Sequence, residues 1–581
     1  MIRSLLNIFC CALLGLSQIA VASAAEFDVI IRQGKVFAGD LSEPRIADVG
    51  IRGDRIAQIG DLSPARGKLE IDATDLVVAP GFINTLSWAT ETLIIDGRSQ
   101  SDIRQGVTLE VFGEGVSMGP LNAQQKAALK ARQSDVQFDI SWTTLGEYLS
   151  FLESRGVSPN VASFVGATTI RTHVIGYDNR PPTAAELEQM QALVASAMRE
   201  GALGVGSSLI YAPATFASTA ELKALVSTAQ AHGGMYISHI RSEGDRLLEA
   251  VDELIEIARD TGARAEIYHL KVSGQANWHK LQPLLTRIEA ARSAGLAIGA
   301  NMYTYTAGST GLDAAMPPWV QEGGLAAWIE RLKDPEIRAR VAAAMVGGKH
   351  DTKQQAAADP QAPWENLLRQ ATAEGTLLVG FKNPALRHYI GQTLAQVAQQ
   401  REQPPHETAI DLVIADGSRV QVVYFLMSAE NVAEIIAQPW VTFGSDAGSY
   451  TAAGVFLKQG THPRAYGNFA RVLGKYSRDE GRLSLNQAIH RLSYLPARRF
   501  KLSDRGALKP GYYADVAIFD PATIQDHATY ARPHQYASGM HHVLVNGIPV
   551  LRDGEHTGAL PGRFVRGPGW QQPASASDPN S

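Results

Sequence analysis

The sequence predicts an α/β protein: a parallel (β/α)8 barrel with a small β-sandwich beside it. Short apolar runs alternate with helical patterns through the middle of the chain, as expected of repeated βαβ units in a parallel sheet. The number of these runs is close to eight, which favours a closed barrel over an open sheet. Both ends of the chain contain only short strand-like runs separated by turn residues, so we expect the ends to pair into the sandwich.

The first 25 residues have the features of a secretory signal peptide. Arg3 precedes an apolar run at 5–16, and small residues follow at 22–25; the run is too short to be a good membrane span. We therefore expect export across the inner membrane, to the periplasm if the source is bacterial, without membrane insertion after signal removal. A cytoplasmic protein with an apolar N-terminal helix is the alternative.

Composition excludes several functional classes. Both cysteines, Cys10 and Cys11, lie inside the signal segment, so the mature chain would have no disulfide, cysteine nucleophile or thiolate metal ligand. The net charge of −5 is weak for 581 residues, of which 19% are charged. We therefore expect neither nucleic acid nor an anionic membrane as a partner.

The remaining chain divides into segments that differ in composition and in apolar pattern. Short runs rich in β-branched residues fill its two ends, and a Pro/Ser-rich stretch closes it, which is typical of a disordered tail. In the middle, the strand–helix rhythm breaks before the last predicted barrel strand, and we expect a large insertion near the barrel mouth. The predicted boundaries are 26–80 and 501–567 for the two parts of the sandwich, 81–500 for the barrel, about 318–425 for the insertion and 568–581 for the tail.

The predicted barrel strands are short apolar runs bounded by Gly, Asp or polar residues. Between two of them, residues 245–258 place apolar side chains at helical spacing, which predicts a helix that connects two parallel strands. In chain order the strands are expected at 77–84, 106–112, 161–165, 203–206, 234–239, 265–268, 296–300 and 440–446.

Two histidines mark equivalent points of successive βα units. His239 and His269 each come at the end of a strand-like run, with the helix of residues 245–258 between them. In a parallel barrel, strand ends of one polarity meet at one mouth, where catalytic groups gather. A lone His in such a position is usually a buried structural residue, but the repeated arrangement favours one bound metal ion.

Several motifs resemble those of the amidohydrolase superfamily, namely 27–34, 78–83, Gly444-Ser445-Asp446 and 506–515. Within it, the chain resembles the N-acyl-D-amino-acid deacylases, also called D-aminoacylases, over roughly residues 27–560. The motifs that carry this finer resemblance are 206–211, 239–243, 269–271, 303–310 and 461–464. The resemblance implies a TIM barrel and metal-dependent hydrolysis of N-acyl-D-amino acids to a carboxylate and a free D-amino acid.

The chain departs from the family pattern in two places. Leu86 and Trp88 occupy the slots of the superfamily's His-x-His pair, and neither side chain can coordinate a metal, so a second ion is not expected there. Glu114 falls on the position of the family's Cys ligand. The resemblance then implies one Zn²⁺ held by Glu114, His239 and His269, a donor set with an open fourth position. The alternative is that Glu114 is a turn residue facing water.

The resemblance also assigns the remaining site residues. Asp446 ends a strand-like run and is expected to act as general base and acid, although it could also ligate the metal. A helix N-cap is its structural alternative. Tyr211, Lys271, Tyr303 and Ser309 are expected to bind the substrate. Packing is the alternative for Tyr303, and a solvated rim position is the alternative for Lys271. His462 and Arg464 are expected to line the opening.

Other functions stay open at this stage. A related amidohydrolase could act on dipeptides, isoaspartyl dipeptides or cyclic amides. A hydantoinase-like enzyme would need a carbamylated Lys on the strand before the first His, and residues 203–206 contain none. A catalytically inactive binding barrel is the alternative of another class. The chain keeps both strand-end histidines and Asp446 of the family pattern, which argues against that alternative.

Overall fold

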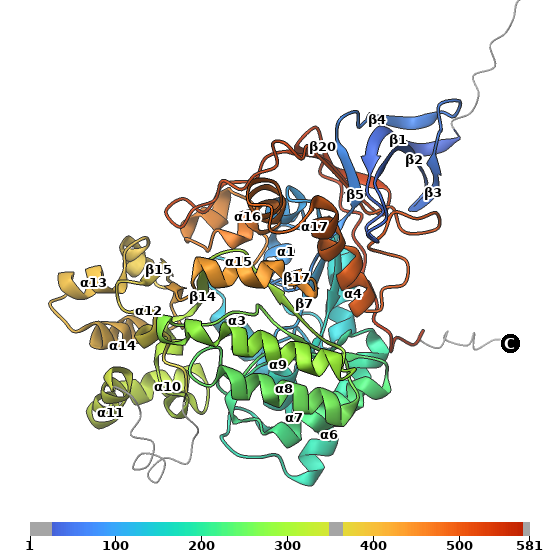
Figure 1. Cartoon of the computed structure of the whole chain (residues 1–581). Helices are drawn as coiled ribbons and strands as arrows, with labels where there is room; N and C mark the ends of the chain where they lie inside the picture. The colour runs from blue at the N-terminus through green and yellow to red at the C-terminus, as the bar shows by residue number, and fades with distance from the viewer. Residues whose placement is uncertain (1–25, 348–363, 573–581) are drawn as a thin grey trace, which may run out of the picture.

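The computed structural model describes residues 26–347 and 364–572 (Figure 1). The predicted signal peptide, 1–25, lies outside the described residues, as does the 573–581 part of the predicted tail. Within the described ranges, no helix is long and apolar enough to cross a membrane.

The middle of the chain forms a ring of parallel strands, called the barrel below. Neighbouring strands pair in parallel and follow chain order. The first and last strands meet where Thr85 N donates to Phe443 O (3.3 Å) and Asp446 N donates to Leu86 O (2.8 Å). The strands are β6 (Phe82–Asn84), β7 (Val107–Phe112), β8 (Asn160–Ser163), β9 (Val165–Gly166), β10 (Gly204–Ser208), β11 (Met235–His239), β12 (Ala265–Ile267), β13 (Ile298–Met302) and β17 (Val441–Phe443). The mixed α/β class is therefore confirmed.

Amphipathic helices cover the outside of the barrel (Figure 1). The predicted helix between the two histidine strands is α8 (Leu247–Thr261), which buries Leu247, Val251 and Leu254 and ends at Gly262 with φ 68°. Only glycine adopts that left-handed conformation at little cost. Its neighbours are α7 (Thr219–Ala231) and α9 (Leu281–Ser293). The other outer helices are α1 (Thr92–Ile95), α2 (Gln100–Ile103), α3 (Ala123–Arg132), α4 (Leu145–Arg155), α5 (Ala167–Ile175), α6 (Ala184–Glu200), α15 (Ala429–Ala437), α16 (Arg464–Arg471), α17 (Leu485–Leu492) and α18 (Tyr494–Arg499).

Alternate residues of the strands fill the barrel interior. Because strand side chains point alternately to opposite faces, one set packs on the helices and the other set forms its own apolar cluster. That inner cluster includes Ile83, Leu109, Val111, Ala162, Phe164, Met235, Ile237 and Tyr268.

Phe164 is the residue at which one barrel strand is interrupted, between β8 and β9. It is fully buried, and its ring packs edge-on against Phe500 at 5.8 Å between centroids. We expect Phe164→Ala to lower the free energy of unfolding by about 3–5 kcal/mol, because it leaves a cavity in the interior. Urea unfolding of the variant measures this loss. Leu560→Ala is the control, because the Leu560 side chain is 41% exposed. Equal denaturation midpoints for the two variants would contradict the interior assignment.

The two ends of the chain pair, as predicted. Strands β5 and β18 run antiparallel, with Val78 opposite Ile518, so blue and red ribbons form one unit in Figure 1. All the strands of both ends join one hydrogen-bonded sheet, and not two separately bonded sheets, because β5 bonds to β1 on one side and to β18 on the other. Its strands are β1 (Phe27–Val36), β2 (Arg45–Arg52), β3 (Arg55–Gly60), β4 (Gly67–Asp72), β5 (Val77–Pro80), β18 (Val516–Phe519), β19 (Met540–Val545), β20 (Ile548–Arg552) and β21 (Glu555–His556).

A separate helical and strand-containing segment lies between β13 and β17. It starts at β14, earlier than the predicted residue 318, and includes a three-stranded antiparallel sheet in the order β14-β16-β15. Its described elements are β14 (Ala307–Gly311), α10 (Leu325–Leu332), α11 (Pro335–Val346), α12 (Leu367–Ala371), β15 (Thr376–Gly380), α13 (Leu394–Gln400), α14 (Pro405–Asp416) and β16 (Gln421–Phe425).

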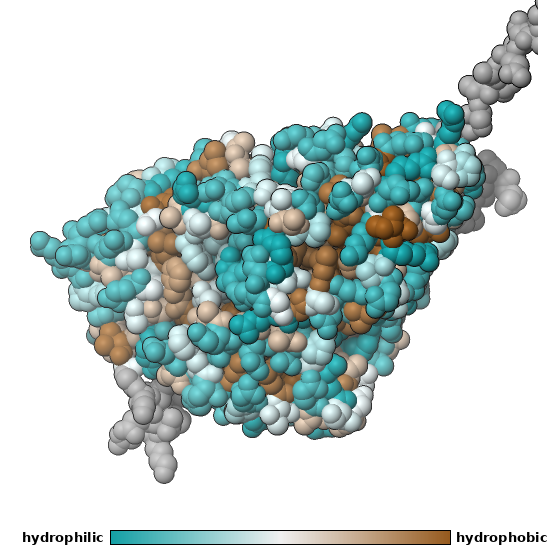
Figure 2. All heavy atoms as spheres, turned by 45° about the horizontal axis from the view of Figure 1, so that its top comes forward, coloured by the Kyte–Doolittle hydropathy of each residue, from teal (hydrophilic) through white to brown (hydrophobic). Residues whose placement is uncertain are grey.

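On the face of the molecule seen in Figure 2, hydrophilic residues dominate and apolar residues form small separate areas.

Candidate metal centre and active site

Glu114, His239 and His269 come together at one end of the barrel. Each offers a ligand atom, and these atoms all lie within 4.8 Å of one another. Glu114 Oε1 lies 3.1 Å from His239 Nδ1 and 2.8 Å from His269 Nε2. The two imidazole rings are nearly perpendicular, at 83°, with their centroids 4.4 Å apart. All three side chains are buried, so the group is a compact set of one oxygen and two nitrogen donors.

Strand ends and a glycine turn position the three donors. His239 is the last residue of β11, and His269 lies two residues past β12. Glu114 lies just past β7, between Gly113 (φ 107°) and Gly115 (φ 70°). A Cβ at Gly115 would lie 2.0 Å from Ser208 Oγ, so only glycine lets the turn approach β10 this closely. His269 itself has φ 36°, a costly conformation for a non-glycine residue and one that is frequent at functional sites.

The electrostatics of the group favour a bound cation. Burial alone would raise the pKa of Glu114, but His269 and His239 hold it well below its ordinary value. Burial and Lys271 act to lower the pKa of His269, yet the carboxylates of Glu243 and Glu114 raise it to about 9. The carboxylates therefore create a local potential that stabilises positive charge at the point where the three donors meet.

The donor set fits a single zinc ion. Two imidazole nitrogens and one carboxylate oxygen are ligands that Zn²⁺ accepts, and three protein ligands leave a fourth position open for catalysis. His239 Nε2 is buried and has no hydrogen-bond partner among the described residues, so this nitrogen is free to serve as a ligand if the ring turns. The predicted group thus has the composition and the compactness of a catalytic metal site.

Glu243 supports the metal group from behind and was not assigned by the sequence. Its Oε1 lies 3.0 Å from His269 Nδ1 and 2.5 Å from Lys271 Nζ. Burial opposes the effect, but Lys271 holds the pKa of Glu243 below its usual value. A carboxylate behind a ligating imidazole fixes the ring orientation and its tautomer. Glu243 lies in a loop four residues after His239, where no local sequence signal indicates this contact.

Asp446 lies beside the metal group at the end of β17. Its Oδ1 accepts a hydrogen bond from Trp88 Nε1 (3.1 Å), and the same indole N–H also donates to Glu114 Oε2 (2.9 Å). Asp446 Oδ2 forms an ion pair with Arg464 Nη1 at 2.9 Å. Burial raises the pKa of Asp446 above its ordinary value, although Arg464 opposes the shift. The φ of 50° at Asp446 is a second left-handed, non-glycine backbone at this site.

A cavity of about 730 Å³ opens over the metal group. Of the expected substrate-binding residues, Tyr211 lies near His239, with centroids 5.3 Å apart, and Tyr303 near His269, at 6.4 Å. Lys271 lines the cavity, but its ammonium is paired with Glu243. Ser309 also lines it, and its hydroxyl donates to Val422 O (2.8 Å). All four residues therefore reach the same cavity from different elements.

Two arginines bring further positive charge to the cavity wall. Arg464, expected near the opening, is buried with its guanidinium over the Tyr303 ring at 4.4 Å. Its Nε has no hydrogen-bond partner among the described residues. Arg419 lies over the Tyr211 ring at 5.0 Å, and its Nε donates to Asp313. The sequence did not indicate Arg419, because it lies in the segment between β13 and β17, where the barrel periodicity is lost.

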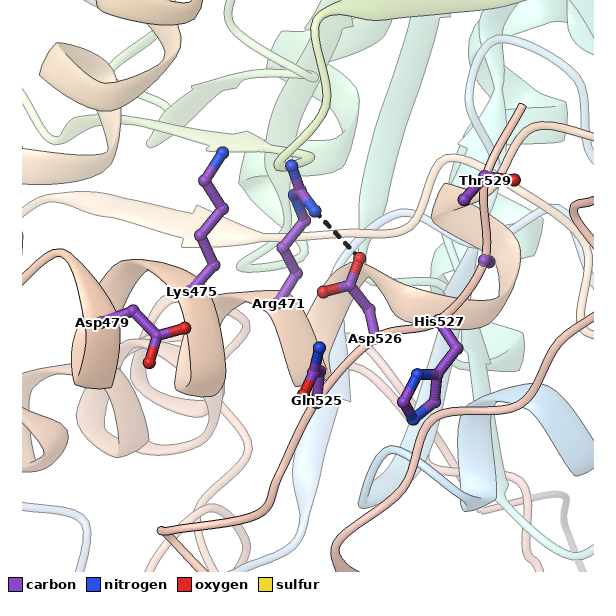
Figure 3. A pocket seen from close by; sticks show the side chains of 8 residues that line it. Arg471, Lys475, Asp479, Gln525, Asp526, His527 and Thr529 are labelled. Atoms are coloured by element: carbon purple, nitrogen blue, oxygen red, sulfur yellow. Dashed lines mark hydrogen bonds and ion pairs between the residues drawn. The ribbon is translucent and has the colours of Figure 1, made fainter. Parts of the chain in front are cut away.

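A second, smaller pocket of about 320 Å³ is lined by a different set of residues (Figure 3). Its centre is the ion pair between Arg471 Nη1 and Asp526 Oδ2, at 2.9 Å, drawn as a dashed line in the figure. None of its lining residues lines the larger cavity. Its polar side chains therefore take no part in the metal group.

Comparison with known proteins identifies relatives over nearly the whole chain. A family model described as "Amidohydrolase family" matches residues 139–551. A D-aminoacylase of Alcaligenes xylosoxydans xylosoxydans is 33% identical over 542 residues, which cover 93% of this chain and 97% of that relative.

Solved structures agree with this similarity. A D-aminoacylase described with a binuclear metal centre, one-metal activation and second-metal attenuation has a TM-score of 0.76 at 32% identity, over 93% of this chain and 100% of that one. An N-acyl-D-glutamate deacylase of Bordetella bronchiseptica has a TM-score of 0.75 at 29% identity, over 93% and 99%. That structure holds zinc and a phosphonate inhibitor that mimics the tetrahedral intermediate.

Proposed function

The chain belongs to the amidohydrolase family, and on that basis we propose that it hydrolyses the amide bond of N-acyl-D-amino acids with one bound Zn²⁺. The observation that carries the proposal is the buried Glu114–His239–His269 group, which lies beside Asp446 at the floor of a large cavity. Relatives named D-aminoacylase and N-acyl-D-glutamate deacylase support the substrate class. The products are a carboxylate and a free D-amino acid.

Glu114, His239 and His269 would hold the ion. A zinc ion at these donors polarises the amide carbonyl and acidifies water. Glu243 and Lys271 keep the His269 ring in place from the opposite side. Because these supporting groups are buried and mutually bonded, the ligand geometry is set before substrate arrives, which lowers the reorganisation needed during reaction.

Asp446 moves the proton. Its carboxylate accepts a proton from the attacking water as the new C–O bond forms, and donates that proton to the nitrogen as the C–N bond breaks. The raised pKa of Asp446, caused by burial, suits a group that must first accept and then release a proton. Trp88 and Arg464 each hold one carboxylate oxygen, so the side chain is fixed beside the metal group.

The substrate carboxylate would be bound at the part of the cavity wall formed by Tyr303, Ser309 and Arg464. Arg464 supplies a charged donor, and Tyr303 and Ser309 supply hydroxyl groups. Lys271 lines the same cavity, but Glu243 neutralises its charge. Among the residues that the structure describes, none accepts a hydrogen bond from the buried Nε of Arg464, which makes it a donor available to an anion. Ser309 must turn its hydroxyl away from Val422 O to donate to a ligand. Tyr211, whose ring packs edge-on against His239, would contact the acyl group.

We expect zinc-loaded protein to cleave N-acetyl-D-amino acids with kcat/KM at least about 100-fold above their L-enantiomers. The wrong enantiomer, with its carboxylate bound, displaces the scissile carbonyl from the metal, and a displacement of about 1 Å can cost a factor of this size. The assay measures free amine released from a panel of N-acetyl-D- and L-amino acids, with D- and L-dipeptides and cyclic amides as further arms.

The control is the same protein stripped by a chelator and then reloaded with zinc. Activity that is indifferent to both treatments would contradict the metal mechanism. Faster cleavage of dipeptides or cyclic amides than of any N-acetyl-D-amino acid would contradict the substrate class.

A further inference from the structure

Trp88 occupies an unusual position between the two carboxylates of the active site. Its Nε1–H donates to Glu114 Oε2 at 2.9 Å and to Asp446 Oδ1 at 3.1 Å. One neutral N–H thus bridges an oxygen of the metal group and an oxygen of the proton-transfer group. The ring is 39% exposed and forms part of the cavity wall, so its position is not explained by burial of apolar surface.

The backbone holds Trp88 in this position. Ser87 forms a parallel bridge with Ala447, and Trp88 N donates to Ala447 O at 2.9 Å. The strand-like pairing continues past β6 and β17, so it ties the residue that carries the indole directly to the segment that carries Asp446. The distance between the indole and the Asp446 carboxylate is therefore set by the closure of the barrel.

We propose that Trp88 is a positioning residue whose indole N–H takes the place of a second metal ion between Glu114 and Asp446, so that the protein is a strict one-ion enzyme. With Oε2 bound to Trp88, Glu114 directs Oε1 to the two imidazoles. With Oδ1 bound to the same N–H, Asp446 stays beside the metal group. This inference rests on the proposed metal-dependent function and concerns the ion count of the same site.

The same contacts close the space to another cation. A second ion between the carboxylates would need Glu114 Oε2 and Asp446 Oδ1, and both oxygens already accept the indole N–H, whose positive end repels a cation. Leu86, two residues before Trp88 in the same segment after β6, is buried and apolar. Over the described residues, Glu114, His239 and His269 form the one group of three or more potential ligands that could hold an ion.

The experiment compares zinc binding to wild type, Trp88→Phe and the matched control Trp570→Phe. Phe keeps an aromatic ring but lacks the N–H. Trp570 is 40% exposed, close to the exposure of Trp88, and lines neither cavity. Each protein is stripped with a chelator and titrated with zinc against a chromophoric chelator, without substrate. Zinc per chain is then counted after dialysis against excess zinc.

We expect wild type and Trp570→Phe to bind one zinc per chain and to keep full activity in excess zinc. Trp88→Phe should bind zinc about 10- to 100-fold more weakly, the usual effect of losing a partner of a metal ligand. At saturating zinc its kcat should fall while KM changes little, because Asp446 loses one of its two partners and the proposed carboxylate-binding residues are unchanged. A residue that merely supports the fold would change the melting temperature of the zinc-free protein and leave the zinc affinity alone.

Zinc affinity of Trp88→Phe within twofold of wild type would overturn the positioning role. Binding of a second zinc to wild type, with altered activity, would overturn the one-ion inference, and this measurement needs no variant to fold. Because the zinc titrations contain no substrate, they stand apart from the substrate panel. Expected zinc results with no cleavage of any N-acetyl-D-amino acid would leave this inference standing and reject the substrate class.

Discussion

Replacement of Asp446 by Asn is expected to lower kcat by about 100- to 10,000-fold, the usual contribution of a positioned general acid–base group. The amide has the shape of the carboxylate but cannot accept a proton from water at neutral pH. Its oxygen can still accept the hydrogen bond from Trp88 Nε1, although the ion pair with Arg464 is lost. The three metal donors are untouched, and zinc content should remain at one ion per chain.

The measurement is steady-state kinetics on the best N-acetyl-D-amino acid, with zinc counted on the same sample. Asp553→Asn is the matched control, because that side chain is 78% exposed, and its kcat should equal that of wild type. A loss of zinc in Asp446→Asn would instead make Asp446 a metal ligand. Retention of most of the wild-type kcat would contradict its role in proton transfer.

His269→Ala should remove both the bound zinc and the activity. The imidazole is one of three donors, and its Nε2 and Nδ1 connect Glu114 to Glu243. Without the ring, two donors remain, and the carboxylates of Glu114 and Glu243 lose the imidazole that lies between them. We expect kcat/KM to fall by about 1,000-fold or more, since metal polarisation contributes several kcal/mol to transition-state stabilisation.

Zinc analysis and kinetics on the purified variant check this expectation. His388→Ala is the control, because His388 is exposed and its ring hydrogen-bonds only to Ala385 O among the described residues. Added zinc at high concentration should not restore His269→Ala. If the variant kept one tightly bound ion and most of its activity, the ion would have to be held by other residues, and the assignment of the centre would fail.

The positions of the two histidine donors could be predicted because each depends on local order. His239 ends an apolar run of strand length, and the helix after it follows the 3.6-residue period, so the strand end and its polarity are both readable. The strand β12 was readable in the same way and places His269 near its end. Glu114 required the family resemblance as well, because its turn carries no period of its own.

Other features of the site depend on contacts between distant parts of the chain. Trp88 and Asp446 are 358 residues apart in sequence, and Trp88 and Glu114 are 26 apart. No pattern within either segment indicates that one indole N–H bridges both carboxylates. No sequence pattern indicates that Lys271 pairs with Glu243 either, since the sequence predicts only a lysine that faces the barrel mouth.

By itself, then, the amino-acid order determined the α/β class, the pairing of the two chain ends and which histidines lie at strand ends, because strand and helix periods are local. The tertiary structure alone decided that both chain ends share one continuous sheet, that Lys271 is neutralised by a neighbour and that Trp88 sits between two carboxylates. The physical reason is that ring closure, through the bonds between residues 85–88 and 443–447, brings groups together whose spacing in the sequence carries no information about their distance in space.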